Sequence, residues 1–368
     1  RARGRGLLGA VGLELAARAD ALVPQDLPRG LLVRVADDVT GIIWSLTFAD
    51  CLGGGAPEAA RAVLARVGHF LDADSRPSSL PLSARVPPPR SRTLQEPRVV
   101  LESADRLVIE KPAGWEVDDH SGEAKVLKPE SSVGSLLKYL QALVSPREWP
   151  ILGDRAHRHG FLHRLDVPGS GAVMVAKTYT AYYDLQLQLS AGNLLRDYTV
   201  LGHGWWPPDR GEVCERIYWV QGQRSASRIC PRGRPARTLL RVLAHAMQEG
   251  AALSFLAVRI ITGRRHQIRL HAAHTGHATV CDGKYAARPT FRADLPWCSR
   301  NFLHRHRLAL RDGAAASSPF PPELVAALAA LAARPGTPSA AALRRCREGV
   351  APRSWEAEDV LSRPRRKK

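Results

Sequence analysis

Apolar and polar residues alternate along the chain with two different periods. Apolar side chains recur at helical spacing in several stretches, which predicts amphipathic helices at residues 57–71, 131–144, 179–189 and 322–333. Short apolar runs predict strands at residues 99–101, 107–110, 172–176, 198–201 and 254–258. Helices and strands mix without a regular βαβ repeat. We therefore expect an α+β fold, with a mixed, mainly antiparallel sheet and flanking helices.

Composition divides the chain into four segments. Residues 1–80 hold apolar stretches without a chemical motif, and could form either a small accessory region or an extension packed on the main body. Residues 81–97 are rich in proline, as linkers are. The dense alternation of predicted strands and helices over 98–312 indicates the main domain. Residues 313–368 are expected to be an alanine-rich helical stretch followed by a basic tail.

The chain carries a large excess of positive charge. Its 368 residues include 53 Lys and Arg against 35 Asp and Glu, a formal net charge of +18. Such an excess favours polyanionic partners, namely RNA, DNA or an anionic membrane surface. No apolar run reaches the roughly 18 residues of a transmembrane helix, so we expect no membrane span.

Three features bear on the compartment. The six cysteines form no Cys-x-x-Cys pair, which argues against a zinc ribbon and favours a reducing, intracellular compartment. The arginine-rich start, residues 1–5, has the composition of an organelle transit peptide, although an arbitrary truncation would look the same. The basic run 363–368 could contact phosphates, act as a nuclear address, or simply be a solvated tail. Mitochondrion, plastid, nucleus and cytoplasm all stay open.

One carboxylate stands in the most distinctive stretch of the sequence. Asp166 follows His163, Arg164 and Leu165 and precedes a turn that contains Gly169, and glycine lets the backbone pass close to a ligand. A carboxylate there can act as nucleophile or base if it is ionised and aimed at a substrate. On spacing alone, however, Asp166 more readily caps a turn or pairs with Arg164.

A second dense block, about a hundred residues later, supplies cations. If this block is an alternating strand, Arg265, Gln267 and Arg269 lie on one face; alternatively the chain turns from strand into helix over residues 264–275. Arg269 could pair with Asp166 and keep it ionised, and its arginine neighbours could grip phosphates. An exposed basic strand edge would show the same pattern.

Tyr198 lies on a predicted strand. A tyrosine in that position can stack on a base, and its hydroxyl can take part in proton transfer. A half-buried core tyrosine is the simpler alternative.

Histidines gather in three groups: His157, His159 and His163; His266, His271, His274 and His277; His304 and His306. A metal site needs three or four convergent ligands. Arginines lie between these histidines, and their charge disfavours a bound cation. We therefore expect no metal.

Taken in order, these blocks resemble the RluA-type family of RNA pseudouridine synthases. The resemblance extends over residues 95–312, with a looser echo at 302–308. It rests on the motifs Val108–Gly114, His163–Gly171, Tyr198–Gly204 and Gly263–His271, the last of which continues through Gly276 and His277 to Asp282. It implies a pseudouridine synthase-like catalytic domain. Uracil would be detached from its ribose, turned, and rejoined through C5, which requires no cofactor.

The resemblance also implies roles for individual residues. Asp166 matches the aspartate that attacks or activates the target uridine. Tyr198 matches the tyrosine that stacks on the flipped base and assists removal of the C5 proton. Arg269 matches the basic residue that pairs with the aspartate. The expected substrate-binding residues are Arg164, Arg264, Arg265, His266 and Gln267.

The implied partner is RNA, whether rRNA, tRNA or mRNA. We expect a monomer without an obligate protein partner.

The sequence departs from the family at three places. The turn Pro168-Gly169-Ser170 stands where Asp/Glu-Thr-Ser is common, and residues 185–189 stand where the family often has an Arg-Phe segment. Cys281 stands where glycine is usual. The altered turn keeps an alternative open, that of an RNA-binding protein that retained the fold and lost turnover. A DNA-binding protein is less well supported, because no helix-turn-helix, homeodomain or zinc-finger signature is present.

Overall fold

The computed structural model describes residues 28–53, 55–73, 81–82, 95–117, 134–220, 226–310, 313–335 and 339–348, together with Glu14 and Arg85. The transit-like start, most of the proline-rich segment and the basic tail lie outside the described residues.

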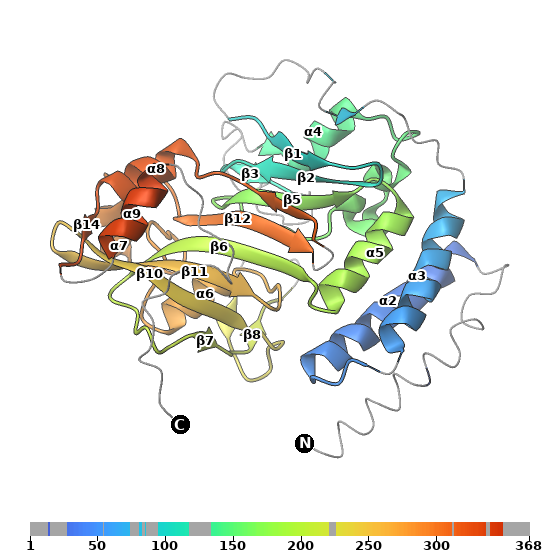
Figure 1. The fold of residues 1–368 in the computed structure, drawn as a ribbon, viewed down its shortest axis with the longest axis horizontal. Helices are drawn as coiled ribbons and strands as arrows, with labels where there is room; N and C mark the ends of the chain where they lie inside the picture. The colour runs from blue at the N-terminus through green and yellow to red at the C-terminus, as the bar shows by residue number, and fades with distance from the viewer. Residues whose placement is uncertain are drawn as a thin grey trace.

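A ten-stranded sheet forms the body of the molecule (Figure 1). Its strands follow the order β1-β2-β5-β12-β6-β11-β10-β14, with β13 beside β12 and β7 beside β10. Only β5 and β12 pair in parallel, and the other pairings in this sheet are antiparallel. This confirms the expected mixed, mainly antiparallel sheet. The strands of this sheet are β1 (Arg98–Glu102), β2 (Arg106–Lys111), β5 (Ser170–Ala176), β6 (Leu194–His203), β7 (Glu212–Val213), β10 (Thr238–Gln248), β11 (Ala251–Ile260), β12 (Leu303–Leu310), β13 (Ala315–Ser317) and β14 (Ala332–Ala333).

Two small sheets and several helices surround this body. The small sheets pair β3 (Trp115–Glu116) with β4 (Gly134–Ser135), and β8 (Ile217–Tyr218) with β9 (Arg228–Ile229). The helices are α2 (Arg29–Phe48), α3 (Ala56–Asp72), α4 (Leu136–Leu143), α5 (Tyr179–Ser190), α6 (Gln267–His274), α7 (Arg288–Asp294), α8 (Pro322–Ala329) and α9 (Ser339–Arg347), and 3-10 turns span Pro150–Gly153 and Arg155–Gly160. Among the described residues, none of the helices is both long and apolar enough to cross a bilayer.

Most of the predicted elements are confirmed, with shifted ends. The helix predicted at 131–144 begins only at Leu136, after the Ser135 side chain accepts a hydrogen bond from the Lys138 N–H. The helix predicted at 322–333 ends at Ala329, and its last residues instead form β14 against β10. The chain after residue 312 therefore continues the same sheet.

The block around Arg269 is a helix and not an alternating strand. β11 ends at Ile260, and His266 has a left-handed backbone (φ 56°) directly before α6 begins at Gln267. The side chain of Gln267 accepts the N–H of Arg264 at 3.0 Å, which closes the turn into the helix. The strand alternative was wrong, because the left-handed backbone at His266 ends the extended conformation and α6 follows at once. On a helix, residues two apart such as Gln267 and Arg269 lie on different sides. The alternative of a turn into a helix is confirmed.

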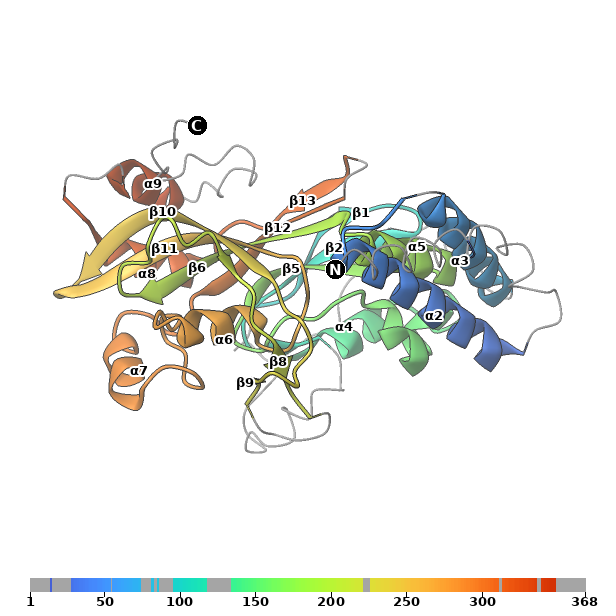
Figure 2. The same ribbon diagram turned by 90° about the horizontal axis from the view of Figure 1, so that it is seen from below.

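The helices α2 and α3 form a hairpin that packs on α5, at the end of the sheet formed by β1, β2 and β5 (Figures 1 and 2). A Cβ at Gly68 would lie 2.5 Å from the Cα of Thr180, so this close approach of α3 to α5 needs glycine. The Asp72 carboxylate accepts the N–H groups of Tyr179 and Thr180, at 2.8 Å each, in the first turn of α5. The hairpin thus shares one apolar core with α5 and β5.

Gly171 lies where β5 meets β12. Its φ is +120°, and a Cβ there would lie 2.2 Å from the carbonyl oxygen of Arg305. We expect Gly171→Ala to lower the free energy of unfolding by about 2–4 kcal/mol, because the backbone is strained and β12 must shift. Urea denaturation measures this difference.

Gly169→Ala is the matched control. Gly169 has no left-handed φ, and its nearest neighbour to an added Cβ is 3.4 Å away. Its expected loss is under about 1 kcal/mol. Equal losses in the two variants would contradict the tight contact between β5 and β12.

Candidate active site

Asp166 lies on the turn that leads into β5. The N–H of Gly169 donates to the Asp166 carbonyl at 3.0 Å and closes this turn. The side chain of Arg300 donates to the Pro168 carbonyl at 3.2 Å and to the Ser170 hydroxyl at 2.8 Å. The unusual Pro168-Gly169-Ser170 sequence therefore forms a turn that is closed by one backbone hydrogen bond and held by Arg300.

Lys111 supports the backbone beside Asp166. This buried side chain ends β2, and its Nζ donates to the carbonyls of Pro112 at 2.9 Å, Trp115 at 2.8 Å and Val167 at 3.4 Å. Burial is the main reason why the pKa of Lys111 lies well below its usual value. The N–H of Gly114 also donates to Val167, at 2.9 Å. The segment 111–114 thus holds the residue that follows Asp166.

Arg269 bridges two carboxylates, those of Asp166 and Asp282. Its Nη1 donates to Oδ2 of Asp166 at 3.1 Å, while Nε and Nη2 make a two-pronged contact with Asp282 at 2.8 and 2.7 Å. Asp282 also accepts the Thr279 hydroxyl, at 3.1 Å, and the N–H groups of Lys284 and Tyr285. This buried anchor fixes the guanidinium that faces Asp166.

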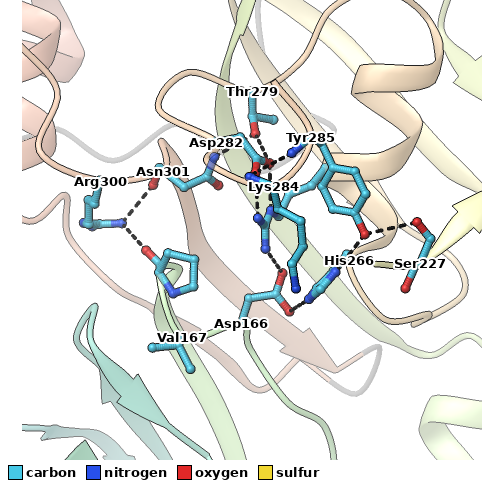
Figure 3. Close-up of polar contacts among 12 residues, drawn as sticks. Asp166, Val167, Ser227, His266, Thr279, Asp282, Lys284, Tyr285, Arg300 and Asn301 are labelled. Atoms are coloured by element: carbon cyan, nitrogen blue, oxygen red, sulfur yellow. Dashed lines mark hydrogen bonds and ion pairs between the residues drawn. The ribbon is translucent and has the colours of Figure 1, made fainter. Parts of the chain in front are cut away.

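His266 approaches Asp166 from the other side. Its Nε2 lies 4.0 Å from Oδ1 of Asp166, and its Nδ1 lies 2.8 Å from the hydroxyl of Tyr285 (Figure 3). That hydroxyl donates to the carbonyl of Ser227 at 3.3 Å. Burial raises the pKa of Tyr285 to about 12, so the phenol stays protonated. The Tyr285 oxygen therefore accepts from Nδ1 of His266, which leaves Nε2 facing the carboxylate.

The local charges keep Asp166 ionised. Burial alone would raise its pKa, but the positive charges of His266, Arg269 and Arg164 outweigh burial, and the pKa falls below its usual 3.8. The side chain remains 13% exposed. It is therefore an ionised carboxylate that a ligand can reach.

Tyr198 lies on β6 and is tied to a buried arginine. Nη2 of Arg305, on β12, donates to the Tyr198 hydroxyl, and the guanidinium carbon lies 4.8 Å from the centre of the Tyr198 ring. Nη1 of Arg305 donates to Nδ1 of His163 at 2.7 Å and to the Ala172 carbonyl at 3.0 Å. Burial first, and then the charge of Arg305, lower the pKa of His163 well below its usual value, so this imidazole is neutral.

The other residues expected at the site fall into two groups. Arg264 and Arg265 are partly exposed on the loop before α6, against the rings of Trp44 and Trp219. Gln267 is buried, and its amide bonds only to the protein's own groups, at Thr262, Arg264, Arg237 and Thr238.

Sequence reasoning assigned no role to Arg305, nor to the second carboxylate, Asp282, although it placed Asp282 in the last family motif. Arg305 gave no local signal, because it stands in a run of alternating histidines and arginines from His304 to Arg307. Among the described residues, no group of three or more His, Cys, Asp or Glu side chains is arranged to hold a metal ion.

Comparisons with known proteins show what this chain is similar to. A family model described as RNA pseudouridylate synthase matches residues 105–274. Ribosomal large subunit pseudouridine synthase D of Yersinia pestis is 34% identical over 221 residues, which cover 58% of this chain and 62% of the relative. The protein of the same name from Escherichia coli K12 is 31% identical with the same coverage. The chain thus spans less than two thirds of the length of these curated relatives.

A solved structure described as Human RNA Pseudouridylate Synthase Domain Containing 1 aligns with 70% of this chain and 98% of its own, at 24% identity and a TM-score of 0.48. Over residues 105–274 the chain is therefore similar to proteins of the pseudouridine synthase class. More narrowly, this part of the chain is similar to the RluA-type family of RNA pseudouridine synthases.

Proposed function

We propose that this protein isomerises specific uridines in structured RNA to pseudouridine, with Asp166 as the reacting carboxylate. The observation that carries this proposal is the ionised, reachable Asp166 held by Arg269 at 3.1 Å. Two curated relatives are named for the large ribosomal subunit, so rRNA is the first substrate class to test, before tRNA and mRNA.

The residues present can divide the reaction between them. The target uridine would be flipped from its stack, at a cost of a few kcal/mol. The N1–C1′ bond breaks and a C5–C1′ bond forms; C5 loses a proton and N1 gains one. Asp166 would attack or activate the target uridine, and Tyr198 would stack on the flipped base and assist removal of the C5 proton. Arg269 would keep Asp166 charged and aimed throughout.

Cations around Asp166 would hold the RNA. We propose Arg164, Arg264, Arg265 and His266 as substrate contacts. Arg164 is partly exposed, and its charge helps to lower the pKa of Asp166, so its guanidinium lies near the proposed reacting carboxylate. For Gln267 we propose a positioning role, because its amide is already used in holding the start of α6.

Mapping pseudouridine in cellular RNA after incubation with the protein tests the proposed function. We expect new pseudouridine at one or a few defined uridines. A protein that binds these RNAs well and forms pseudouridine in none of them would be the inactive RNA-binding alternative.

Arg305→Met should slow the reaction by about 10²-fold, because the Tyr198 hydroxyl loses the donor that fixes its position. We expect kcat to fall and KM for RNA to change little. The comparison with Tyr198→Phe makes the test specific: in that background Arg305→Met should have a much smaller effect. Fully additive losses would show that Arg305 acts independently of the hydroxyl.

A further inference from the structure

The end of the α2 helix and the loop before α6 share a stack of flat groups. The guanidinium carbon of Arg264 lies 5.3 Å from the ring centre of Trp44. The Trp44 and Phe48 rings stack at 5.1 Å between centroids, inclined by 15°. These two residues are four apart on α2 and so lie on one face of the helix. Phe48 is 45% exposed, which leaves part of its ring open to a ligand.

This stack adjoins the candidate active site. Arg264 is two residues from His266, whose Nε2 lies 4.0 Å from Asp166. The Arg264 side chain is fixed, because its Nε donates to the Pro235 carbonyl at 2.9 Å. Consecutive Cα atoms are about 3.8 Å apart, so the Arg264 backbone lies within about 8 Å of that of His266. An RNA whose target uridine reaches Asp166 would have its neighbouring nucleotides within reach of α2.

The charges around the stack favour RNA over an uncharged or basic protein partner. Burial first, and then the charge of Arg234, lower the pKa of Arg264, so a second cation lies close to it. Arg265 lies over the ring of Trp219 at 4.9 Å, and Trp219 is 38% exposed. Aromatic rings beside arginines are the usual surface for unpaired nucleotides, since bases stack on the rings while phosphates meet the cations.

We propose that Trp44, Phe48 and Arg264 form a stacking platform for an unpaired base of the RNA substrate, next to the target uridine. This inference rests on the proposed function, and it gives the N-terminal hairpin a part in substrate binding. Phe48 presents the outer face of the platform. Trp44 and Arg264 link that face to the loop before α6.

The test measures binding of a fluorescently labelled single-stranded oligouridine to the full chain. Phe48→Ala should weaken the affinity about tenfold, the expected loss of one stacked base. Phe48→Trp should restore it, because an indole stacks as well. The slope of affinity against salt should stay unchanged in Phe48→Ala, whereas Arg265→Gln should reduce it by about one.

Leu31→Ala and Phe70→Ala are matched controls on the same hairpin. Both side chains are about as exposed as Phe48, at 42% and 41%, but Leu31 lies in the first turn of α2 and Phe70 in the last turn of α3, whereas Phe48 ends α2. Their affinity should equal that of the unmodified protein. The inference is overturned if Phe48→Ala binds as tightly as the unmodified protein, or if the controls lose as much.

The two proposals fail separately. If the protein forms no pseudouridine but Phe48→Ala still weakens oligouridine binding, the proposed function is wrong and the platform stands. If the protein forms pseudouridine and Phe48→Ala changes neither the affinity nor KM for RNA, the platform is wrong and the function stands.

Discussion

Asp166→Asn is expected to slow pseudouridine formation by at least about 10⁴-fold, the scale of loss when an enzyme's reacting group is removed. The amide is neither a nucleophile nor a base at neutral pH, whereas the carboxylate is ionised by the charges of Arg269, His266 and Arg164. RNA affinity should stay within about twofold, since asparagine has the same shape and still accepts a hydrogen bond from Arg269. Single-turnover rates and direct binding measure the two quantities separately.

Asp184→Asn is the matched control. This acid lies on α5, its side chain is 30% exposed, and it pairs with Arg106 of β2. Neither residue is among the substrate contacts that we propose. Its rate should equal that of the unmodified protein. Unchanged product from Asp166→Asn would show that another group reacts, and an equal loss of affinity and rate would make Asp166 a binding residue.

The second large effect is expected from Arg269→Met, which should lower the free energy of unfolding at neutral pH by about 3–5 kcal/mol. The variant leaves the side chain of Asp282, which is 0% exposed, as a buried charge without its cationic partner. Activity should fall as well, because Asp166 loses the same partner. Urea denaturation over a range of pH measures the change in stability.

The pH dependence of this loss has a definite sign. Burial alone would raise the pKa of Asp282, but Arg269 outweighs burial, and the pKa lies below its usual 3.8. In the unmodified protein this carboxylate therefore contributes stability above pH 3.8, and that contribution is lost as the pH falls through its folded pKa. In Arg269→Met the folded pKa of Asp282 rises, so the deficit should be largest above about pH 5 and should shrink at lower pH.

Two further variants separate charge from geometry. Arg269→Lys keeps the positive charge but cannot make the two-pronged contact, and should recover only part of the stability. Adding Asp282→Asn to Arg269→Met removes the buried charge that has lost its partner. The double variant should therefore lose less free energy of unfolding than the two single variants lose together. A variant Arg269→Met as stable as the unmodified protein at every pH would refute the role of this ion pair.

Local sequence patterns predicted five strands of the sheet, β1, β2, β5, β6 and β11, because each of them contains a short apolar run. β5 is buried along its whole length, and such a run needs no knowledge of its neighbours. The start of α6 could not be fixed in the same way. Five alternating residues fit a strand or a helix equally, and the choice depends on the hydrogen bond from the Arg264 N–H to Gln267.

The ion pair between Asp166 and Arg269 was predicted because both lie in recognisable motifs. Arg305 was not predicted, because its role depends on β12 pairing with β5 and β6, which brings it beside Tyr198 from more than a hundred residues away. The contact between Trp44 and Arg264 joins residues that are even further apart in the sequence. Contacts of this kind follow from how the elements pack and leave no local periodic signal.

Release of tritium from RNA labelled at C5 of uridine tests the central claim most directly. Forming the C5–C1′ bond expels the C5 hydrogen, so each pseudouridine made must release one label to water. We predict release by the unmodified protein that matches the pseudouridine formed, and none above background by Asp166→Asn. Equal release by both proteins, or no release from any RNA that the unmodified protein binds, would contradict Asp166 as the reacting carboxylate of a pseudouridine synthase.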